Sequence, residues 1–200
     1  MLINSQIVEC TIADLPLATA ASKNTFYRIT DLGTGSAVFF SNGSYWLPVG
    51  EVVLKTWNID AVVTGVTDET TLATFTMPKK LASPNMTIVV NAAWTTNATG
   101  GVKNARIRFG GDIVSNPTHN GATLISMQYE SLIRFRNSLN SQFAYGVTVP
   151  TSYTPTSAAS VFLTQDMSAG GSDVDIVLTG QVPALSDNIT LRGYTITLRG

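Results

Sequence analysis

The chain ends with Ser186-Asp187-Asn188-Ile189-Thr190-Leu191-Arg192-Gly193-Tyr194-Thr195-Ile196-Thr197-Leu198-Arg199-Gly200, where apolar and polar residues alternate almost to the end. Such alternation predicts a strand with one buried face, because successive side chains point to opposite faces of a sheet. The alternation slips by one residue at Arg192-Gly193, and a glycine at such a slip indicates a β-bulge. We therefore expect this stretch to be a bulged strand that is tied into a sheet and closes a rigid β-sandwich.

Residues 72–200 carry the same pattern, with turn signals at the intervals typical of an antiparallel sandwich. Within 102–109, for example, Ala105, Ile107 and Phe109 share one face, and the arginines share the other. The fold class expected is all-β. The predicted strands are 72–77, 87–94, 102–109, 122–129, 131–137, 142–149, 158–164, 173–180 and 188–198.

Two smaller segments precede the sandwich. Residues 1–14 form a short arm, and 15–71 form a small β module followed by a β-rich connector. The apolar residues of the arm are too few for a core of their own, so we expect them to dock on a neighbouring molecule. They are Ile3, Ile7, Val8 and Ile12.

The module contains Asn42-Gly43 between two aromatic segments, 37–40 and 45–47. Asn-Gly between strands is a strong hairpin signal, because a type I′ turn needs positive φ at both central residues. We predict a hairpin with a type I′ turn centred on Asn42 and Gly43.

The composition limits the kinds of partner. Charged residues make up only 12% of the 200 residues, and the net charge is -1. A neutral surface of this kind is often buried against other subunits, and without a basic excess we expect no nucleic-acid binding. One cysteine allows no disulfide within the chain and no thiolate cluster. No apolar run is long enough for a membrane span, so no membrane insertion is expected.

Catalytic motifs are missing from the sequence. There is no Gly-x-Ser-x-Gly motif, and a single histidine, His119, would have to serve any triad. Asp173 and Asp175 are the closest same-face acid pair; a solvated strand edge is the favoured interpretation, and a calcium pair is the alternative. We expect no enzyme activity, no metal site and no cofactor.

Aromatic and loop residues are better candidates for binding. Trp46, Trp57, Trp94, Tyr129, Tyr145 and Tyr153 could stack on sugar rings. Trp94 lies in a predicted strand, which favours a position in the core or in a subunit interface. His119 and Asn120 lie in a predicted turn over 116–121, and Tyr153 lies in a proline-bounded loop. Loops on a rigid scaffold are common binding sites, so His119, Asn120 and Tyr153 are the candidate ligand contacts.

Two stretches resemble bacteriophage virion proteins. The first runs from Ala18 through Phe26-Tyr27-Arg28-Ile29-Thr30-Asp31-Leu32-Gly33 to Ser41-Asn42-Gly43-Ser44-Tyr45-Trp46-Leu47-Pro48-Val49, and it resembles a module of phage tail-fibre and head-fibre proteins. The second is Met86 to Asn97 and Lys103 to Gly111, together with the Asp187–Leu198 ending. It is similar to jelly-roll-like tip domains of phage fibres.

This resemblance implies a homotrimer on the outer surface of the virion, attached through its N-terminal part to other virion proteins. The expected function is that of a short fibre whose jelly-roll-like sandwich binds host-surface polysaccharide. The alternative is a head-fibre or capsid decoration protein that stabilises the particle without receptor binding, which the lack of a repetitive shaft favours. A polysaccharide-degrading enzyme is the least favoured of the three.

Overall fold

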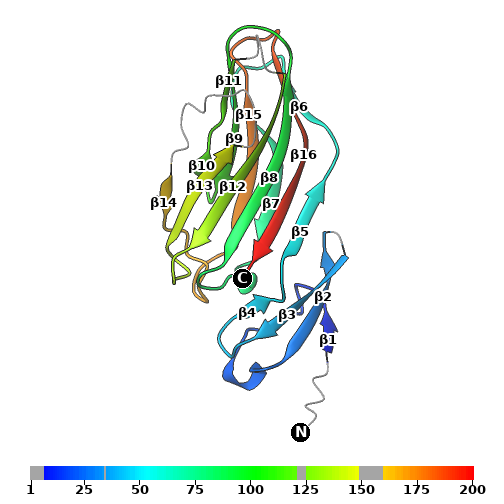
Figure 1. Ribbon diagram of the computed structural model, residues 1–200, viewed down its shortest axis with the longest axis vertical. Helices are drawn as coiled ribbons and strands as arrows, with labels where there is room; N and C mark the ends of the chain where they lie inside the picture. Colours follow the sequence, from blue (N-terminus) through cyan, green and yellow to red (C-terminus); the bar gives the residue numbers. More distant parts are fainter. Residues whose placement is uncertain (1–6, 34, 121–124, 149–159) are drawn as a thin grey trace.

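The computed structural model describes residues 7–33, 35–120, 125–148 and 160–200. These residues form a small four-stranded sheet at one end of an elongated β-sandwich (Figure 1). The expectation of an all-β fold is confirmed. Helical structure in the described residues is confined to the short 3-10 segments η1 (Ala20–Ser22) and η2 (Lys79–Leu81). Nowhere in these ranges is there a helix with the length and apolar character to cross a membrane.

The four-stranded sheet is the N-terminal module. Its strands are β1 (Ile7–Cys10), β2 (Phe26–Leu32), β3 (Gly35–Ser41) and β4 (Trp46–Pro48), in the order β1-β2-β3-β4. β1 pairs with β2 in parallel, and the other pairs are antiparallel. Ile29, Phe39 and Trp46 are buried beneath the sheet, and the Trp46 indole N–H donates to the carbonyl of Pro16 at 2.8 Å. These side chains belong to one continuous cluster of buried apolar residues that extends into the sandwich.

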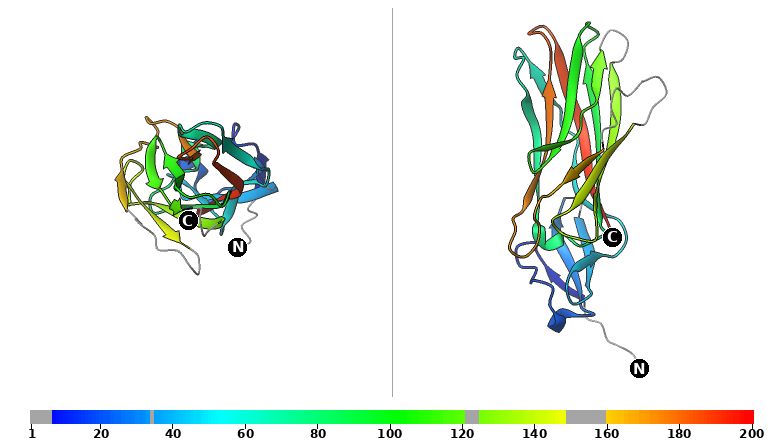
Figure 2. Two further views of the ribbon diagram at one scale, coloured as in Figure 1. Left: turned by 90° about the horizontal axis from the view of Figure 1, so that it is seen from above. Right: turned by 90° about the vertical axis from the view of Figure 1, so that its left-hand side faces the viewer.

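The sandwich is built from the remaining strands. They are β5 (Val52–Trp57), β6 (Ala61–Thr64), β7 (Thr70–Met77), β8 (Thr87–Thr96), β9 (Val102–Phe109), β10 (Asp112–Ser115), β11 (Thr118–Asn120), β12 (Ser126–Phe135), β13 (Gln142–Thr148), β14 (Val161–Leu163), β15 (Val174–Gln181) and β16 (Asn188–Arg199). One sheet has the order β10-β9-β15-β7, with β11 beside β9. The other has the order β14-β13-β12-β8-β16-β5, with β6 beside β16. The two sheets face each other along the long axis (Figure 2).

The connectivity follows jelly-roll order. β7, β8 and β9 alternate between the two sheets, and so do the last two strands, of which β15 lies between β7 and β9. The next strand, β16, belongs to the other sheet and lies between β8 and the β5–β6 segment. Strands that are distant in the chain are therefore neighbours in both sheets, as expected when a jelly roll closes.

The predicted bulge in the last strand is confirmed. Leu191 pairs with Trp94 and Gly193 pairs with the adjacent Ala93, so Arg192 is the extra residue. A Cβ on Gly193 would lie 2.8 Å from the carbonyl oxygen of Trp57, which explains why glycine is needed there. Because of this extra residue, Tyr194 faces the same side of the sheet as Ile189 and Leu191, and all three are buried.

The core lies between the two sheets. Trp94 is buried in the core, which is one of the two positions expected for it. The inward face of β9 is buried as well, while Arg106 and Arg108 lie on its outer face. The other large contributors are Ile88, Val90, Ile107, Phe109, Ile176, Leu178, Ile189, Leu191, Ile196 and Leu198. Large side chains from both sheets thus fill one continuous apolar layer.

Several boundaries differ from the sequence-based expectation. β5 and β6 lie in the expected connector, but both pair with β16, so the seven-stranded sheet begins at Val52. Where two strands were predicted, over 122–129 and 131–137, the described residues form one continuous strand, β12, over Ser126–Phe135. The predicted turn over 116–121 is wrong, because Thr118–Asn120 pair with β9. A strand of three or four residues, such as β6 or β11, is too short to show an alternating apolar pattern in the sequence. Its assignment depends on the strand with which it pairs.

The hairpin at Asn42 forms, but the type I′ prediction is wrong. Positive φ occurs at Gly43, at 95°, and not at Asn42 or Ser44. The Asn42 N–H donates to the Tyr45 carbonyl at 3.2 Å, so Gly43 and Ser44 are the central residues. The Asn42 side-chain oxygen accepts from the N–H groups of Ser44 and Tyr45, at 2.9 and 2.8 Å. This asparagine stabilises the turn through its side chain.

We predict that Gly43→Val destabilises the protein by about 1–3 kcal/mol, because a β-branched residue is strained at positive φ. Its Cβ would also lie 3.3 Å from Cβ of Lys23. Urea unfolding measures the loss. Gly100→Val is the matched control, since Gly100 is exposed with open space around it. Equal stability of the two variants would contradict the strain argument.

Candidate functional site

The junction between the module and the sandwich is held by Lys80. Its ammonium group donates to the backbone carbonyls of Ile12, Ala13 and Leu15, at 2.8, 3.0 and 3.1 Å. An ammonium group has three N–H donors, and all three are used here. Because Lys80 belongs to η2 of the sandwich and the carbonyls belong to the segment after β1, this side chain ties the two parts together.

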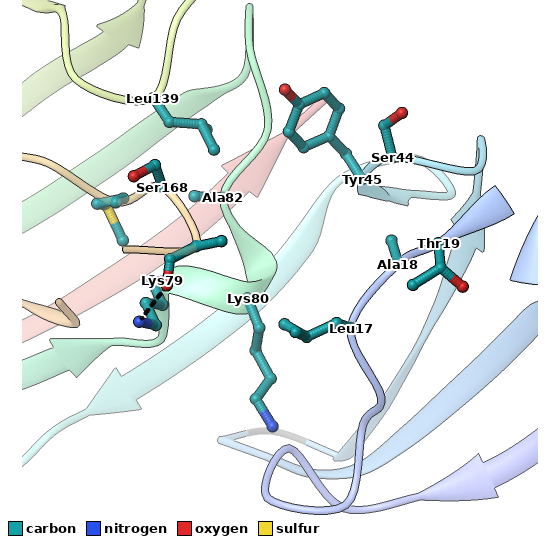
Figure 3. Close-up of a pocket in the computed structure, with 12 residues that line it drawn as sticks. Leu17, Ala18, Thr19, Ser44, Tyr45, Lys79, Lys80, Ala82, Leu139 and Ser168 are labelled. Carbon is teal, nitrogen blue, oxygen red and sulfur yellow. Dashed lines mark hydrogen bonds between the residues drawn. The ribbon is translucent and has the colours of Figure 1, made fainter. Parts of the chain in front are cut away.

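A cavity of about 190 Å³ lies beside this junction (Figure 3). The module contributes Leu17, Ala18 and Tyr45 to its wall, and the sandwich contributes Leu139 and Met167. Lys79 lines it as well, but its ammonium donates to the carbonyls of Ala169 and Gly171, at 3.1 and 2.6 Å. Both lysines are thus occupied by backbone carbonyls, and the cavity is a gap in a structural joint, with no free base or nucleophile from them.

The second contact in the joint depends on Gly33. Its N–H donates to the Leu54 carbonyl of β5 at 3.1 Å. A Cβ at Gly33 would lie 2.8 Å from that oxygen and from Cα of Lys55. The backbone directly after β2 can approach β5 this closely only because residue 33 has no side chain.

The arm residues form part of the module. Ile7 and Val8 lie on β1, at the edge of the four-stranded sheet, and are 52% and 39% exposed. Ile12 packs partly against the core, and its N–H donates to the Asp31 carboxylate at 2.7 Å. Ile3 lies outside the described residues. An edge strand that carries exposed apolar side chains offers both backbone groups and apolar surface to a partner.

The distal end of the sandwich, formed by 97–101 and 182–187, lies opposite the module (Figure 1). Asn97 and Asn188 each donate a backbone N–H to the other's side-chain oxygen, at 3.1 and 3.0 Å. Lys103 is fully buried, donates to the carbonyl and hydroxyl of Thr99, both at 3.0 Å, and lies 3.7 Å from Asp187. The Thr99 hydroxyl donates to Asp187 in turn. These bonds hold the distal loops in one arrangement.

The candidate ligand contacts are only partly described. His119 and Asn120 lie on β11, where they pair with Lys103 and Val102 of β9. This places their backbone near the distal end of the sandwich. Tyr153 lies outside the described residues. Whether these residues contact a ligand stays a prediction.

The acid pair has structural partners. An oxygen of Asp173 accepts from the Lys79 backbone N–H at 2.8 Å, and an oxygen of Asp175 accepts from the Thr76 hydroxyl at 2.6 Å. Across the part of the chain that the structure describes, no three His, Cys, Asp or Glu side chains gather closely enough to hold a metal ion.

Glu69 has the most perturbed carboxyl group. It accepts two hydrogen bonds from the Arg108 guanidinium, both at 2.8 Å, and one from the Thr179 hydroxyl at 2.6 Å. Arg106 lies 3.0 Å away. The Arg108 hydrogen bonds, with help from Thr179 and the charge of Arg106, lower its pKa to about 2. A carboxyl group with this pKa is ionised at neutral pH, so it cannot act as a proton donor.

Several of the aromatic residues that could stack on sugar rings are buried and therefore cannot contact a ligand. Trp46, Trp94 and Tyr129 lie in the core. Trp57 is 39% exposed, and its indole N–H donates to the Ile59 carbonyl at 3.1 Å. Tyr145 lies partly exposed on the outer face of β13. Sequence reasoning missed Lys80, whose only signal is a lysine pair after Pro78, and Phe162, which is 66% exposed on β14.

Comparison with known proteins adds no relative: no protein-family model matches the chain, and no curated protein does either.

Lys80→Met should lower the free energy of unfolding by about 1.5–3 kcal/mol, because it removes hydrogen bonds from a charged donor to three carbonyls. Urea unfolding followed by tryptophan fluorescence measures this. Lys23→Met removes the same charge from an exposed lysine of the module and should have little effect. If both variants unfold at the same urea concentration, Lys80 does not hold the joint.

Glu69→Gln should make the protein less stable at pH 7 by about 1–2 kcal/mol, a value reduced for partial solvent exposure. The folded pKa of about 2 lies below the ordinary 4.5. The ionised carboxylate therefore stabilises the fold above pH 4.5, and this contribution is lost as the pH falls toward 2. The variant should lose part of that acid sensitivity. Glu51→Gln, at a more exposed ion pair with Arg199, is the control. Parallel stability curves for Glu69→Gln and the unmodified protein between pH 7 and pH 2 would refute this assignment.

Proposed function

We propose that this protein is a structural and binding protein of a bacteriophage particle, a short homotrimeric fibre on the virion surface. The N-terminal module attaches it to other virion proteins, and the jelly-roll sandwich extends outward and binds host-surface polysaccharide. The sequence resemblance over both parts of the chain is the origin of this proposal.

The observation that carries the proposal is the exposed edge of β1. Among the described residues, no strand pairs with the outer side of β1, and Ile7 and Val8 are exposed at that edge. Such an edge is suited to strand addition by another protein. The joint at Lys80 and Gly33 then sets the direction in which the sandwich extends from that attachment.

The proposal assigns no catalytic role to the chain. Asp173 and Asp175 are engaged by Lys79 and Thr76, and Glu69 is kept ionised by arginines. A decoration protein that stabilises the particle without binding a receptor is the competing function, and the low charge of the chain suits it equally well.

We predict that Ile7→Asp or Val8→Asp prevents incorporation into particles, because a carboxylate would be buried in the attachment contact. Both residues are exposed in the free chain, so folding should be unaffected. Immunoblots of purified particles measure incorporation. Val62→Asp is the matched control, since Val62 is 53% exposed on β6 of the sandwich.

Normal incorporation of both variants would refute attachment through β1. In light scattering, the unmodified protein and all three variants are expected to have three times the chain mass of 21.3 kDa, and a monomer would refute the trimer. Particles that lack the protein separate the two functions: reduced adsorption to host cells supports receptor binding, whereas intact adsorption with fragile particles supports decoration.

A further inference from the structure

Strands β12, β13 and β14 lie at one edge of the sandwich (Figure 1). An aromatic strip crosses their outer face. We define it as Arg134, Arg136, Phe143, Tyr145 and Phe162. Arg134 pairs with Phe143, and Phe143 pairs with Phe162, so these three lie side by side across the strands. The neighbours Gln142, Ala144 and Leu163 are buried, which shows that the strip points away from the core.

The strip is a row of three mutually tilted rings with a guanidinium group at each end. Arg136 lies 4.9 Å from the ring centre of Phe162, which is 5.1 Å from that of Phe143. The Phe143 ring is 5.7 Å from the Tyr145 ring, and Arg134 lies 5.4 Å from the Tyr145 ring. Each contact is within the range of aromatic and cation–π interactions.

The two arginines of the strip differ from the others in the described residues. Arg134 and Arg136 have no carboxylate partner there, and both are exposed. The remaining arginines each form an ion pair with Asp or Glu; they are Arg28, Arg106, Arg108, Arg192 and Arg199. A cation–π contact does not neutralise charge, so within the described residues the strip keeps two positive charges without an ion-pair partner beside its aromatic rings.

We propose that the aromatic strip binds an anionic glycan, a polysaccharide whose sugars carry carboxylate or phosphate groups. The apolar face of a sugar ring packs on an aromatic face, and guanidinium groups bind carboxylate or phosphate through paired hydrogen bonds. The exposed Phe162 ring is the platform, and Arg134 and Arg136 select the negative charge. This inference specifies the ligand class of the proposed function and depends on it only for the source of the glycan.

Nucleic acid fits the strip less well. It too offers rings and phosphates, but its binding depends on the release of many counterions by a basic surface. The chain has a net charge of -1, and the strip supplies only two cations. A neutral glycan would leave both guanidinium charges without a partner.

The test uses the purified full chain in native gels that contain polygalacturonate, phosphomannan or neutral dextran. We expect retardation by at least one anionic polymer and none by dextran, with the two anionic gels distinguishing carboxylate from phosphate. Phe162→Ala and Arg136→Gln should each weaken binding by about tenfold or more, and 0.5 M salt should weaken it as well. Arg192→Gln, an exposed and paired arginine, makes the same change of charge and should bind within about twofold of the unmodified protein.

Failure of both anionic polymers to retard the protein would overturn the inference. Equal losses in Arg136→Gln and Arg192→Gln would also overturn it, because they would show a general charge effect. Tighter binding of a thymidine oligonucleotide than of either polymer would assign the strip to nucleic acid, and a changed mass of Phe162→Ala in light scattering would assign it to a subunit interface. The proposed function is tested separately: Phe162→Ala should still enter particles, and Ile7→Asp should still bind the polymer.

Discussion

Strand β16 has a bonded neighbour on both sides over nearly its whole length. Asn188 to Leu191 pair with β6, Tyr194 to Leu198 pair with β5, and β8 lies along the opposite side. Its inward side chains are fully or almost fully buried, and the seven-stranded sheet would be split without it. Because its partners lie far back in the chain, the sandwich is completed by non-local contacts, which usually make folding slow.

In the joint between the module and the sandwich, backbone carbonyl groups accept the hydrogen bonds of a charged ammonium group. Lys80 reaches from η2 to three carbonyls of the segment after β1, and Gly33 allows a direct backbone contact with Leu54. Because hydrogen bonds are directional, they fix the angle between the module and the sandwich more firmly than apolar packing alone would. The edge of β1 and the aromatic strip are therefore held at a defined separation on one molecule.

The alternation of apolar and polar residues predicted those features that depend on a single strand. The buried face of β9, the core position of Trp94 and the bulge at Arg192-Gly193 are all visible as local patterns. Features that depend on pairing between distant segments were not visible. The aromatic strip exists because Arg134, Phe143 and Phe162 share a register across three strands. Likewise, nothing near Lys80 in the sequence indicates that its ammonium will meet the carbonyls of residues 12–15, and the turn at Asn42 depends on a side-chain hydrogen bond.

The route from the module into β5 has a mechanical consequence. β5 leaves the module directly after β4 and runs antiparallel to β16 along the long axis of the molecule (Figure 2). A pull on the module along this axis acts parallel to the β5–β16 ladder and loads its hydrogen bonds together in shear, whereas a sideways pull would break them one after another. The fold therefore resists tension best along its long axis, which runs from the module to the distal end of the sandwich.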